Sequence, residues 1–254
     1  MTMSLEKIKQ LRALTGAGIQ ECKSALESAN GSIEEAIVIM RKLGFAKSVA
    51  RSYKEAKEGV IRAKVLGSKA AIIEVNCESD FVSRGDKFQE FVNQALDILL
   101  TSNDLQAIEA KKQELVLSVS ENVQVSRHQV IQGSSQDSVY VYNHGDKSAC
   151  MLELDGCTNL ELGNNIAMQI VACQPTYVDE LPSEVIKVEC QILESKHPNK
   201  PAKVMEMITS GALKTLQEEQ CLLHQRFFKD SSVTIKDMLQ DCKVIKFFLF
   251  AKKI

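Results

Sequence analysis

The sequence has no long apolar run and no targeting segment. No apolar stretch reaches the ~18–20 residues that a membrane-spanning helix needs. Residues 1–5 lead almost directly into a helical pattern, with neither the apolar core of a signal peptide nor the Arg- and Ser-rich composition of a transit peptide. We therefore expect a cytoplasmic protein that does not interact with a membrane.

The sequence also has no excess of charge of one sign. Its 31 Lys and Arg residues are almost balanced by 33 Asp and Glu residues, so the net charge is −2. Proteins whose main partner is a nucleic acid usually carry a strong basic excess, because they must neutralise phosphates. The balance therefore argues against direct binding of nucleic acid.

Motifs for metal binding and covalent catalysis are absent as well. The eight cysteines are scattered without any C-x-x-C pair, so we expect reduced, mostly buried thiols and no metal site. There is no P-loop, and the glycine pattern that begins with Gly16 and Gly18 has Glu21 where a dinucleotide-binding motif needs its third glycine. The four histidines are dispersed. We expect no cofactor and no catalytic residue, and an enzyme with an unrecognised site is the least favoured class.

Residues 4–43 have the pattern of three short amphipathic helices. Thr15-Gly16-Ala17-Gly18 separates the first two, because glycine adopts positive φ at no steric cost. Asn30-Gly31 ends the second helix, and Ser32 with Glu35 forms a capping box for the third. We expect a three-helix domain over residues 1–44, whose thin core favours binding of a partner over an enclosed active site.

The rest of the chain predicts short strands and grouped helices. Strands are expected over 59–66, 70–75, 123–131, 139–142, 149–154 and 244–251, and helices over 86–100, 105–117, 160–173, 183–195, 201–217 and 234–240. Without strict strand–helix alternation, this order indicates an α+β fold with antiparallel sheets. We expect a helical linker over 45–58, a core subdomain over 59–136, and a second over 137–254 that includes a helical hairpin at about 183–217.

The segment Asn76 to Val82 has two interpretations. In the first, Asp80 caps a helix and Phe81 packs in the core. In the second, Asp80 and Phe81 are an exposed carboxylate and ring, placed by the end of a rigid strand, that enter a crevice of a partner. The residues alone favour the first.

At this point the sequence resembles the elongation factor Ts family. Thr15-Gly16-Ala17-Gly18, followed by Cys22-Lys23 and Ala25-Leu26, resembles the opening signature of that family. Glu74-Val75-Asn76-Cys77 with Ser79-Asp80-Phe81-Val82 resembles its E-V-N-C-x-T-D-F-V motif. Weaker matches follow at Glu121-Asn122, Tyr142-Asn143-His144-Gly145 and Ile166-Ala167-Met168. The resemblance spans nearly the whole chain, in the order of the family.

The resemblance implies a ubiquitin-associated-like N-terminal domain, two core subdomains and a helical hairpin often used for homodimer contacts. It implies binding to the GTPase elongation factor Tu, in its GDP-bound and nucleotide-free forms. Ser79, Asp80, Phe81 and Val82 would act as a wedge near the Mg²⁺ and nucleotide site of the GTPase. Further partner contacts are implied at Arg12, Ile19 and Gln20 in the first domain, and at His144 in the second subdomain. Ser79 stands where the family has Thr, and Ile19-Gln20 replaces a more apolar pair.

The function that follows is a guanine nucleotide exchange factor in translation, without covalent catalysis. The main alternative is an adaptor that binds another protein through the three-helix domain and exchanges no nucleotide. Capture of the GTPase from a lysate, or its absence, separates the two.

Overall fold

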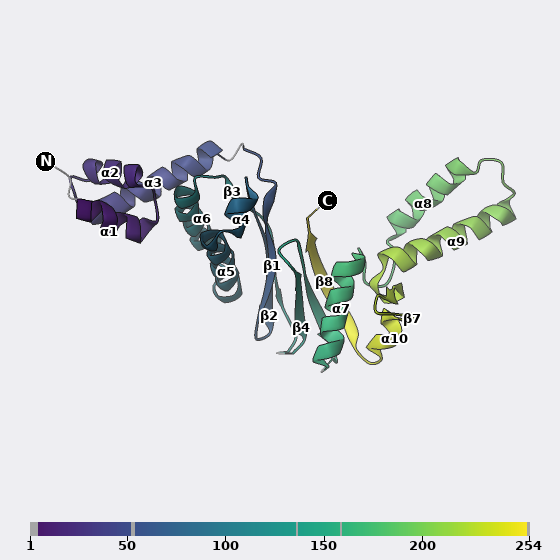
Figure 1. Ribbon diagram of the computed structural model, residues 1–254. Helices are drawn as coiled ribbons and strands as arrows, with labels where there is room; N and C mark the ends of the chain where they lie inside the picture. The colour runs from purple at the N-terminus through teal and green to yellow at the C-terminus, as the bar shows by residue number, and fades with distance from the viewer. Residues whose placement is uncertain (1–4, 52–53, 136, 158, 253–254) are drawn as a thin grey trace. The chain divides into compact units, whose positions relative to one another are not determined.

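The chain forms two compact α+β units (Figure 1). The structure, a computed structural model, describes residues 5–51, 54–135, 137–157 and 159–252, and for residues 45–51 the backbone alone. The first unit comprises residues up to 130 without 65–70, and the second comprises 65–70 and 131–254. The α+β fold predicted from the sequence is confirmed, with helices at the N-terminus and antiparallel sheets after them.

The first unit begins with three helices: α1 (Leu5–Thr15), α2 (Ile19–Ser28) and α3 (Ile33–Arg51). Gly16 adopts a φ of 68° in the turn between α1 and α2, as the sequence predicted. Gly31 also has a positive φ, of 83°, in the turn before α3. Ser32 follows it and caps α3, because its hydroxyl oxygen accepts from the backbone N–H of Glu35 at 3.3 Å. The buried residues that form the core of this bundle are Ile8, Leu11, Ala17, Cys22, Ala25, Leu26, Ala29, Ala36 and Met40.

The third helix is longer than the sequence predicted. Three helices were expected within residues 4–43, followed by a helical linker over 45–58; instead the third helix continues without a break to Arg51. The linker expectation is wrong beyond it, because residues 54–57 are not helical and a strand begins at Glu58. Gly44, which could have ended it, lies where α3 meets a later helix, α6 (Leu105–Val119). A Cβ atom at Gly44 would lie 2.9 Å from the carbonyl oxygen of Gln113 and 2.9 Å from Leu117 Cδ1. The glycine therefore allows close packing of the two helices, and Leu117 joins the bundle's core.

The remainder of the first unit is a sheet covered by helices. Its strand order is β1 (Glu58–Leu66), β2 (Lys69–Cys77), β3 (Val123–Gln132), with β2 in the centre. After β2 come the short helix α4 (Asp80–Arg84) and the longer α5 (Asp86–Thr101), which lies beside α6 (Figure 1). Apolar residues from β2, α5 and α6 form one core, which includes Ile73, Val75, Phe88, Phe91, Leu96 and Val116. The helices predicted over 86–100 and 105–117 are confirmed.

The second unit has a separate antiparallel sheet, with the order β4 (Val139–His144), β5 (Ser148–Asp155), β8 (Lys243–Ala251). The tight turn after His144 pairs that residue with Ser148, which in turn pairs with Ala251 on β8. Helix α7 (Leu160–Cys173) packs on this sheet, and its core includes Leu152, Leu154, Ile166 and Ile170. These elements have the positions that the sequence predicted.

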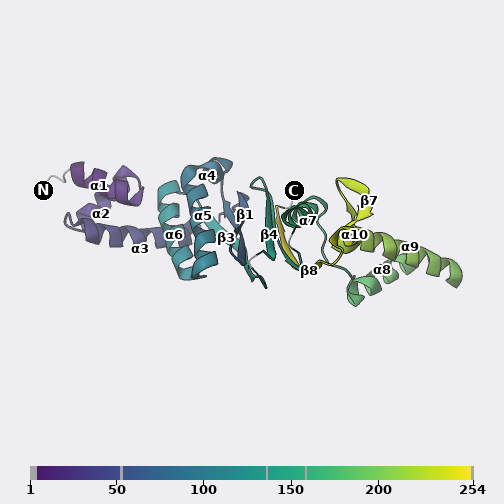
Figure 2. The same ribbon diagram turned by 90° about the horizontal axis from the view of Figure 1, so that it is seen from below.

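Two long helices, α8 (Ser183–Lys196) and α9 (Ala202–Gln220), form the expected hairpin (Figures 1 and 2). A single turn of 3₁₀ helix (Leu222–His224) follows. It leads to a small ribbon, β6 (Arg226–Phe227) and β7 (Asp230–Thr234), and to α10 (Ile235–Leu239). The ribbon was not predicted, because a two-residue strand has too few residues to show a period of two.

No disulfide joins the eight cysteines, all of which the structure describes, and five of them are buried, as their scatter in the sequence predicted. Over the described residues, no helix combines the length and the apolarity that crossing a membrane requires. Over the same residues, no group of three or more His, Cys, Asp or Glu side chains is arranged to hold a metal ion.

Candidate partner-binding site

Phe81 is the most exposed large apolar side chain among the described residues, with 86% of its surface accessible. It is the second residue of α4, which starts three residues after the last residue of the central strand β2. The sequence interpretation in which Phe81 packs in the core is therefore wrong. Contact of this ring with a partner would recover hydrophobic free energy that the folded chain leaves unused, which makes Phe81 a candidate contact residue.

The cap of α4 also differs from the first interpretation. Ser79, and not Asp80, is the N-cap residue, and its hydroxyl oxygen accepts from the N–H of Val82 at 3.4 Å. Asp80 is the first helical residue, and its carboxylate pairs with Arg84 one turn later at 3.3 Å, on the surface. Serine at the N-cap leaves the Asp80 carboxylate facing outward beside the exposed ring.

Val82 turns the other way from Phe81. It is half-buried and packs against the core of sheet and helices. Ser83 is buried, and its hydroxyl donates to the carbonyl of Asp80 at 2.9 Å. One face of α4 is thus attached to the core, while the other presents Asp80 and Phe81 to the exterior.

The three N-terminal residues that the family resemblance implied lie together around one turn. Arg12 is in the last turn of α1, and Ile19 and Gln20 open α2. All three are exposed, Ile19 to 57%. Leu14, also exposed, adds a second apolar side chain near Ile19 in sequence. The residues on either side of this turn therefore include exposed apolar side chains and one exposed cation, Arg12.

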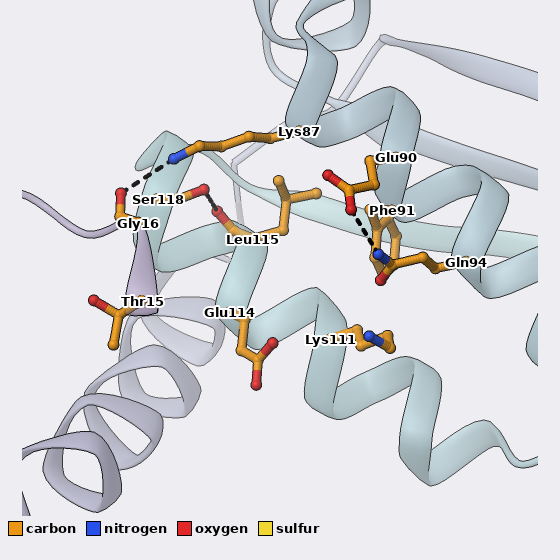
Figure 3. Close-up of a pocket in the computed structure, with 10 residues that line it drawn as sticks. All are labelled: Thr15, Gly16, Lys87, Glu90, Phe91, Gln94, Lys111, Glu114, Leu115 and Ser118. Carbon is orange, nitrogen blue, oxygen red and sulfur yellow. Dashed lines mark hydrogen bonds between the residues drawn. The ribbon is translucent and has the colours of Figure 1, made fainter. Parts of the chain in front are cut away.

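A lysine from α5 connects this turn to the rest of the unit. Lys87 Nζ donates to the carbonyl oxygen of Gly16 at 3.1 Å, across a hollow of about 210 Å³ (Figure 3). The hollow is lined by side chains of α5 and α6, among them Glu90, Lys111 and Glu114. Lys87 lies six residues after Phe81 in sequence, so the turn that carries the N-terminal residues contacts the helix that follows the exposed ring.

His144 lies in the second unit, at the end of β4, and is exposed. Its ring is 6.4 Å from that of Tyr142, and both border a largely apolar cavity of about 560 Å³. Met168 and Phe228 also line the cavity, and among its described lining residues none is acidic while three are lysines. His144 is therefore at the rim of a concave, cationic surface.

Phe228 is a candidate that sequence reasoning missed. It is 46% exposed on the ribbon, with Lys229 Nζ 5.6 Å from the centre of its ring. The buried amide of Gln169 on α7 fixes the ribbon, because its oxygen accepts from the N–H of Phe228 at 2.9 Å and its nitrogen donates to the carbonyl of Arg226 at 3.1 Å. The only sign of it in the sequence was the adjacent pair Phe227-Phe228. In the structure Phe227 is buried and Phe228 is exposed.

Most of the large pKa shifts belong to buried or partly buried groups elsewhere: burial raises the pKa of the Cys150 thiol, and burial followed by the Cys157 neighbour raises that of the Tyr140 phenol. Both groups lie in the core of the second unit. The candidate surfaces are suited to bind a partner by shape, apolar area and charge.

Comparison with known proteins agrees with this picture. The model of the family described as Elongation factor TS matches residues 78–252. Elongation factor Ts of Chlamydia trachomatis serovar L2 is 38% identical, over 93% of this chain and 90% of the relative. Elongation factor Ts of a Hydrogenobaculum species is 38% identical, over 93% of each chain, and that of Chlamydia caviae is 35% identical, over 94% of this chain and 91% of the relative. The chain belongs to the elongation factor Ts family.

Proposed function

We propose that the protein binds elongation factor Tu and accelerates the release of GDP and the exchange for GTP, by disturbing the Mg²⁺ and phosphate contacts of the bound nucleotide. The observation that carries this proposal is the exposure of Phe81, on a short helix attached to the core through its opposite face. An aromatic ring supplies a large apolar area with only two side-chain torsions to fix on binding. Asp80 brings a carboxylate to the same place, where it would meet charged groups around the nucleotide phosphates.

The energetics of exchange require more than attachment. If the factor weakens binding of GDP to the GTPase, GDP must weaken binding of the factor to the GTPase by the same amount, because the two binding equilibria are linked. It must therefore bind the nucleotide-free GTPase better than the GDP-bound form, with both complexes formed during the cycle. The Phe81 wedge supplies the contact that differs between these two states. The other surfaces supply affinity that both states share.

Two surfaces fit that second role. In the first unit, Arg12, Ile19 and Gln20 present exposed apolar and cationic groups around one turn. In the second unit, His144 and Phe228 border the cationic cavity, which suits an apolar segment with acidic ends. Ser79 and Val82 hold the wedge and complete its base. No step of this mechanism makes or breaks a covalent bond, and none needs a cofactor of the factor's own.

The helical hairpin supports a further contact, with a second copy of the chain. Among its described residues, α9 has none that is buried, and Met207 on α9 and Val188 on α8 are both largely exposed. Apolar side chains left uncovered on two adjacent helices are typical of a surface that pairs with another protein. We propose a homodimer through the hairpin, for which light scattering of the wild type and of Met207→Asp is the test. A wild-type monomer at high micromolar concentration would contradict it.

The experiment for the main proposal measures the release of a fluorescent GDP analogue from elongation factor Tu, chased by excess unlabelled GDP. Adding this chain should raise the release rate with a saturable dependence on its concentration. In equilibrium titrations, GDP should weaken binding of the chain, by the same factor by which the chain weakens binding of GDP. No acceleration, with a cognate GTPase and a working positive control, would instead favour the adaptor, which binds another protein through the three-helix domain.

A further inference from the structure

Helix α4 carries the wedge and is too short to hold its own position. It has five residues, from Asp80 to Arg84, which is well below the ~12–15 residues at which an isolated helix becomes marginally stable in water. Its outward ring, Phe81, is mostly in solvent and anchors nothing. The direction of the wedge therefore depends on contacts at the start of α4 and on the inward residues Val82 and Ser83.

The strongest of these contacts comes from Glu121, which is 42 residues away from Ser79 in sequence. One carboxylate oxygen accepts from the backbone N–H of Ser79 at 3.0 Å, and the other accepts from the Ser79 hydroxyl at 2.6 Å. Hydrogen bonds to a carboxylate are shorter and stronger than those between neutral groups. The hydroxyl proton is directed toward Glu121, which leaves a lone pair of the same oxygen free to accept from Val82 N and cap α4.

The local backbone delivers Glu121 to this place. Helix α6 ends at Val119, and Ser120 adopts a left-handed conformation with a φ of 57°, so the chain turns sharply before Glu121. The next residue, Asn122, is buried, and its N–H donates to Glu78 Oε1 at 2.7 Å. Glu121 thus binds Ser79 and Asn122 binds Glu78, so the two segments run antiparallel where they meet.

A third segment joins this crossed pair. The side-chain amide of Asn122 donates to the carbonyl of Lys54 at 2.6 Å, and Lys54 Nζ lies 3.5 Å from Glu78 Oε2. The end of β2, the end of α6 and the segment before β1 are therefore tied together at the start of α4. This degree of fixation exceeds what a single N-cap serine supplies.

We infer that Glu121 is a positioning residue for nucleotide exchange: its carboxylate holds Ser79, and through it α4, so that Asp80 and Phe81 project rigidly toward the partner. The inference rests on the proposed function. A flexible wedge must be ordered at the moment it displaces the nucleotide contacts, and that entropy cost lowers the rate of exchange. The remote surfaces of the factor are unaffected, so binding as such changes little.

The first test compares Glu121→Ala, Glu121→Gln and wild type in the GDP-release assay, over a range of factor concentrations. We expect Glu121→Ala to lower the maximal release rate by roughly 10-fold, with the half-saturating concentration changed less than about twofold. Glu121→Gln keeps one acceptor oxygen and should lose only part of that rate. The matched control is Glu109→Ala, which removes an exposed carboxylate from α6 that pairs with Lys112 at 2.7 Å. Equal maximal rates for Glu121→Ala and Glu109→Ala would overturn the inference.

A double substitution separates positioning from general loss of structure. If Glu121 acts through the wedge, Glu121→Ala should slow the wild type strongly and the Phe81→Ala variant hardly at all. If it only supports the fold, the two losses should multiply. A Phe81→Ala/Glu121→Ala variant that is about 10-fold slower than Phe81→Ala would therefore contradict a role through Phe81.

A second measurement needs no partner. The chain contains four tyrosines and no tryptophan, so Phe81→Trp introduces a single indole at the wedge, which can be excited selectively at its red edge. Time-resolved anisotropy of the indole should show markedly greater fast motion when Glu121→Ala is added, and little change when Glu109→Ala is added. If the wild type fails to accelerate GDP release, the proposed function is wrong. The anisotropy then decides by itself whether Glu121 positions residue 81, and unchanged motion would refute it.

Discussion

Truncation to alanine should affect the stability of the fold very differently at two phenylalanines that lie seven positions apart. Phe81 is 86% exposed and Phe88, on α5, is 0% exposed. A fully buried aromatic side chain removes ~200 Å² from water, so Phe81 hides only about 30 Å². At ~25 cal/mol per Å², that contact contributes about 0.7 kcal/mol to the free energy of unfolding. The better helix propensity of alanine, by ~0.5 kcal/mol, offsets most of this loss.

Phe81→Ala should therefore change the free energy of unfolding by less than about 0.5 kcal/mol, whereas a buried Phe→Ala substitution such as Phe88→Ala typically costs ~3–5 kcal/mol. Urea unfolding followed by far-ultraviolet circular dichroism measures both. The free energy of unfolding falls by ~1–3 kcal/mol per M of urea, so Phe88→Ala should lower the urea midpoint for unfolding of the first unit by at least about 1 M. A comparable drop for Phe81→Ala would refute the argument that the ring lies outside the core.

Three other perturbations test separate parts of the account. Ile19→Asp places a charge on the exposed start of α2, so the half-saturating concentration for GDP release should rise about tenfold at an unchanged maximal rate; an unchanged titration would remove Ile19 from the interface. Gly44→Val puts side-chain atoms against the Gln113 carbonyl, so hydrogen exchange near the end of α6 should speed up while the bundle stays helical, and unchanged exchange would contradict the close packing of α3 on α6. Burial, followed by the neighbouring Cys157 thiol, raises the pKa of Cys242 to about 11. Its alkylation by iodoacetamide at pH 8 should therefore be ~100-fold slower than that of a thiol with an ordinary pKa near 9.0, and the rate should rise about tenfold per pH unit up to about pH 11. A plateau of the rate near pH 9, followed by peptide mass spectrometry, would contradict the shift.

The long elements of the fold followed from the sequence because their periodicity is strong. Helices such as α5 bury seven residues at regular spacing along one face, and a pattern of that length is hard to misread. The short elements did not follow. Helix α4 and the β6–β7 ribbon are too brief for a period to show, and their positions depend on tertiary contacts such as those of Gln169.

The candidate site was proposed from a family motif, and its geometry did not follow from the sequence. The motif around Asp80 and Phe81 was visible, yet the residues alone favoured an Asp80 cap and a buried Phe81. Ser79 caps α4 in place of Asp80, and its hydroxyl is held by Glu121, which is 42 residues away in sequence. No local spacing rule reports such a contact. In the same way, Phe228 joins His144 at one cavity because a buried amide on α7 holds its ribbon.

The central claim is that Phe81 accelerates exchange more than it strengthens binding. The most direct measurement is the maximal rate of GDP-analogue release from elongation factor Tu at saturating factor, together with the half-saturating concentration, for wild type and Phe81→Ala. Leu105→Ala, which truncates another exposed apolar residue of the same unit, serves as the control. The account predicts that Phe81→Ala loses most of the acceleration and keeps much of the binding, while the control resembles wild type. Equal losses of rate and binding would show that Phe81 is only an anchor, and an unchanged rate would contradict the wedge.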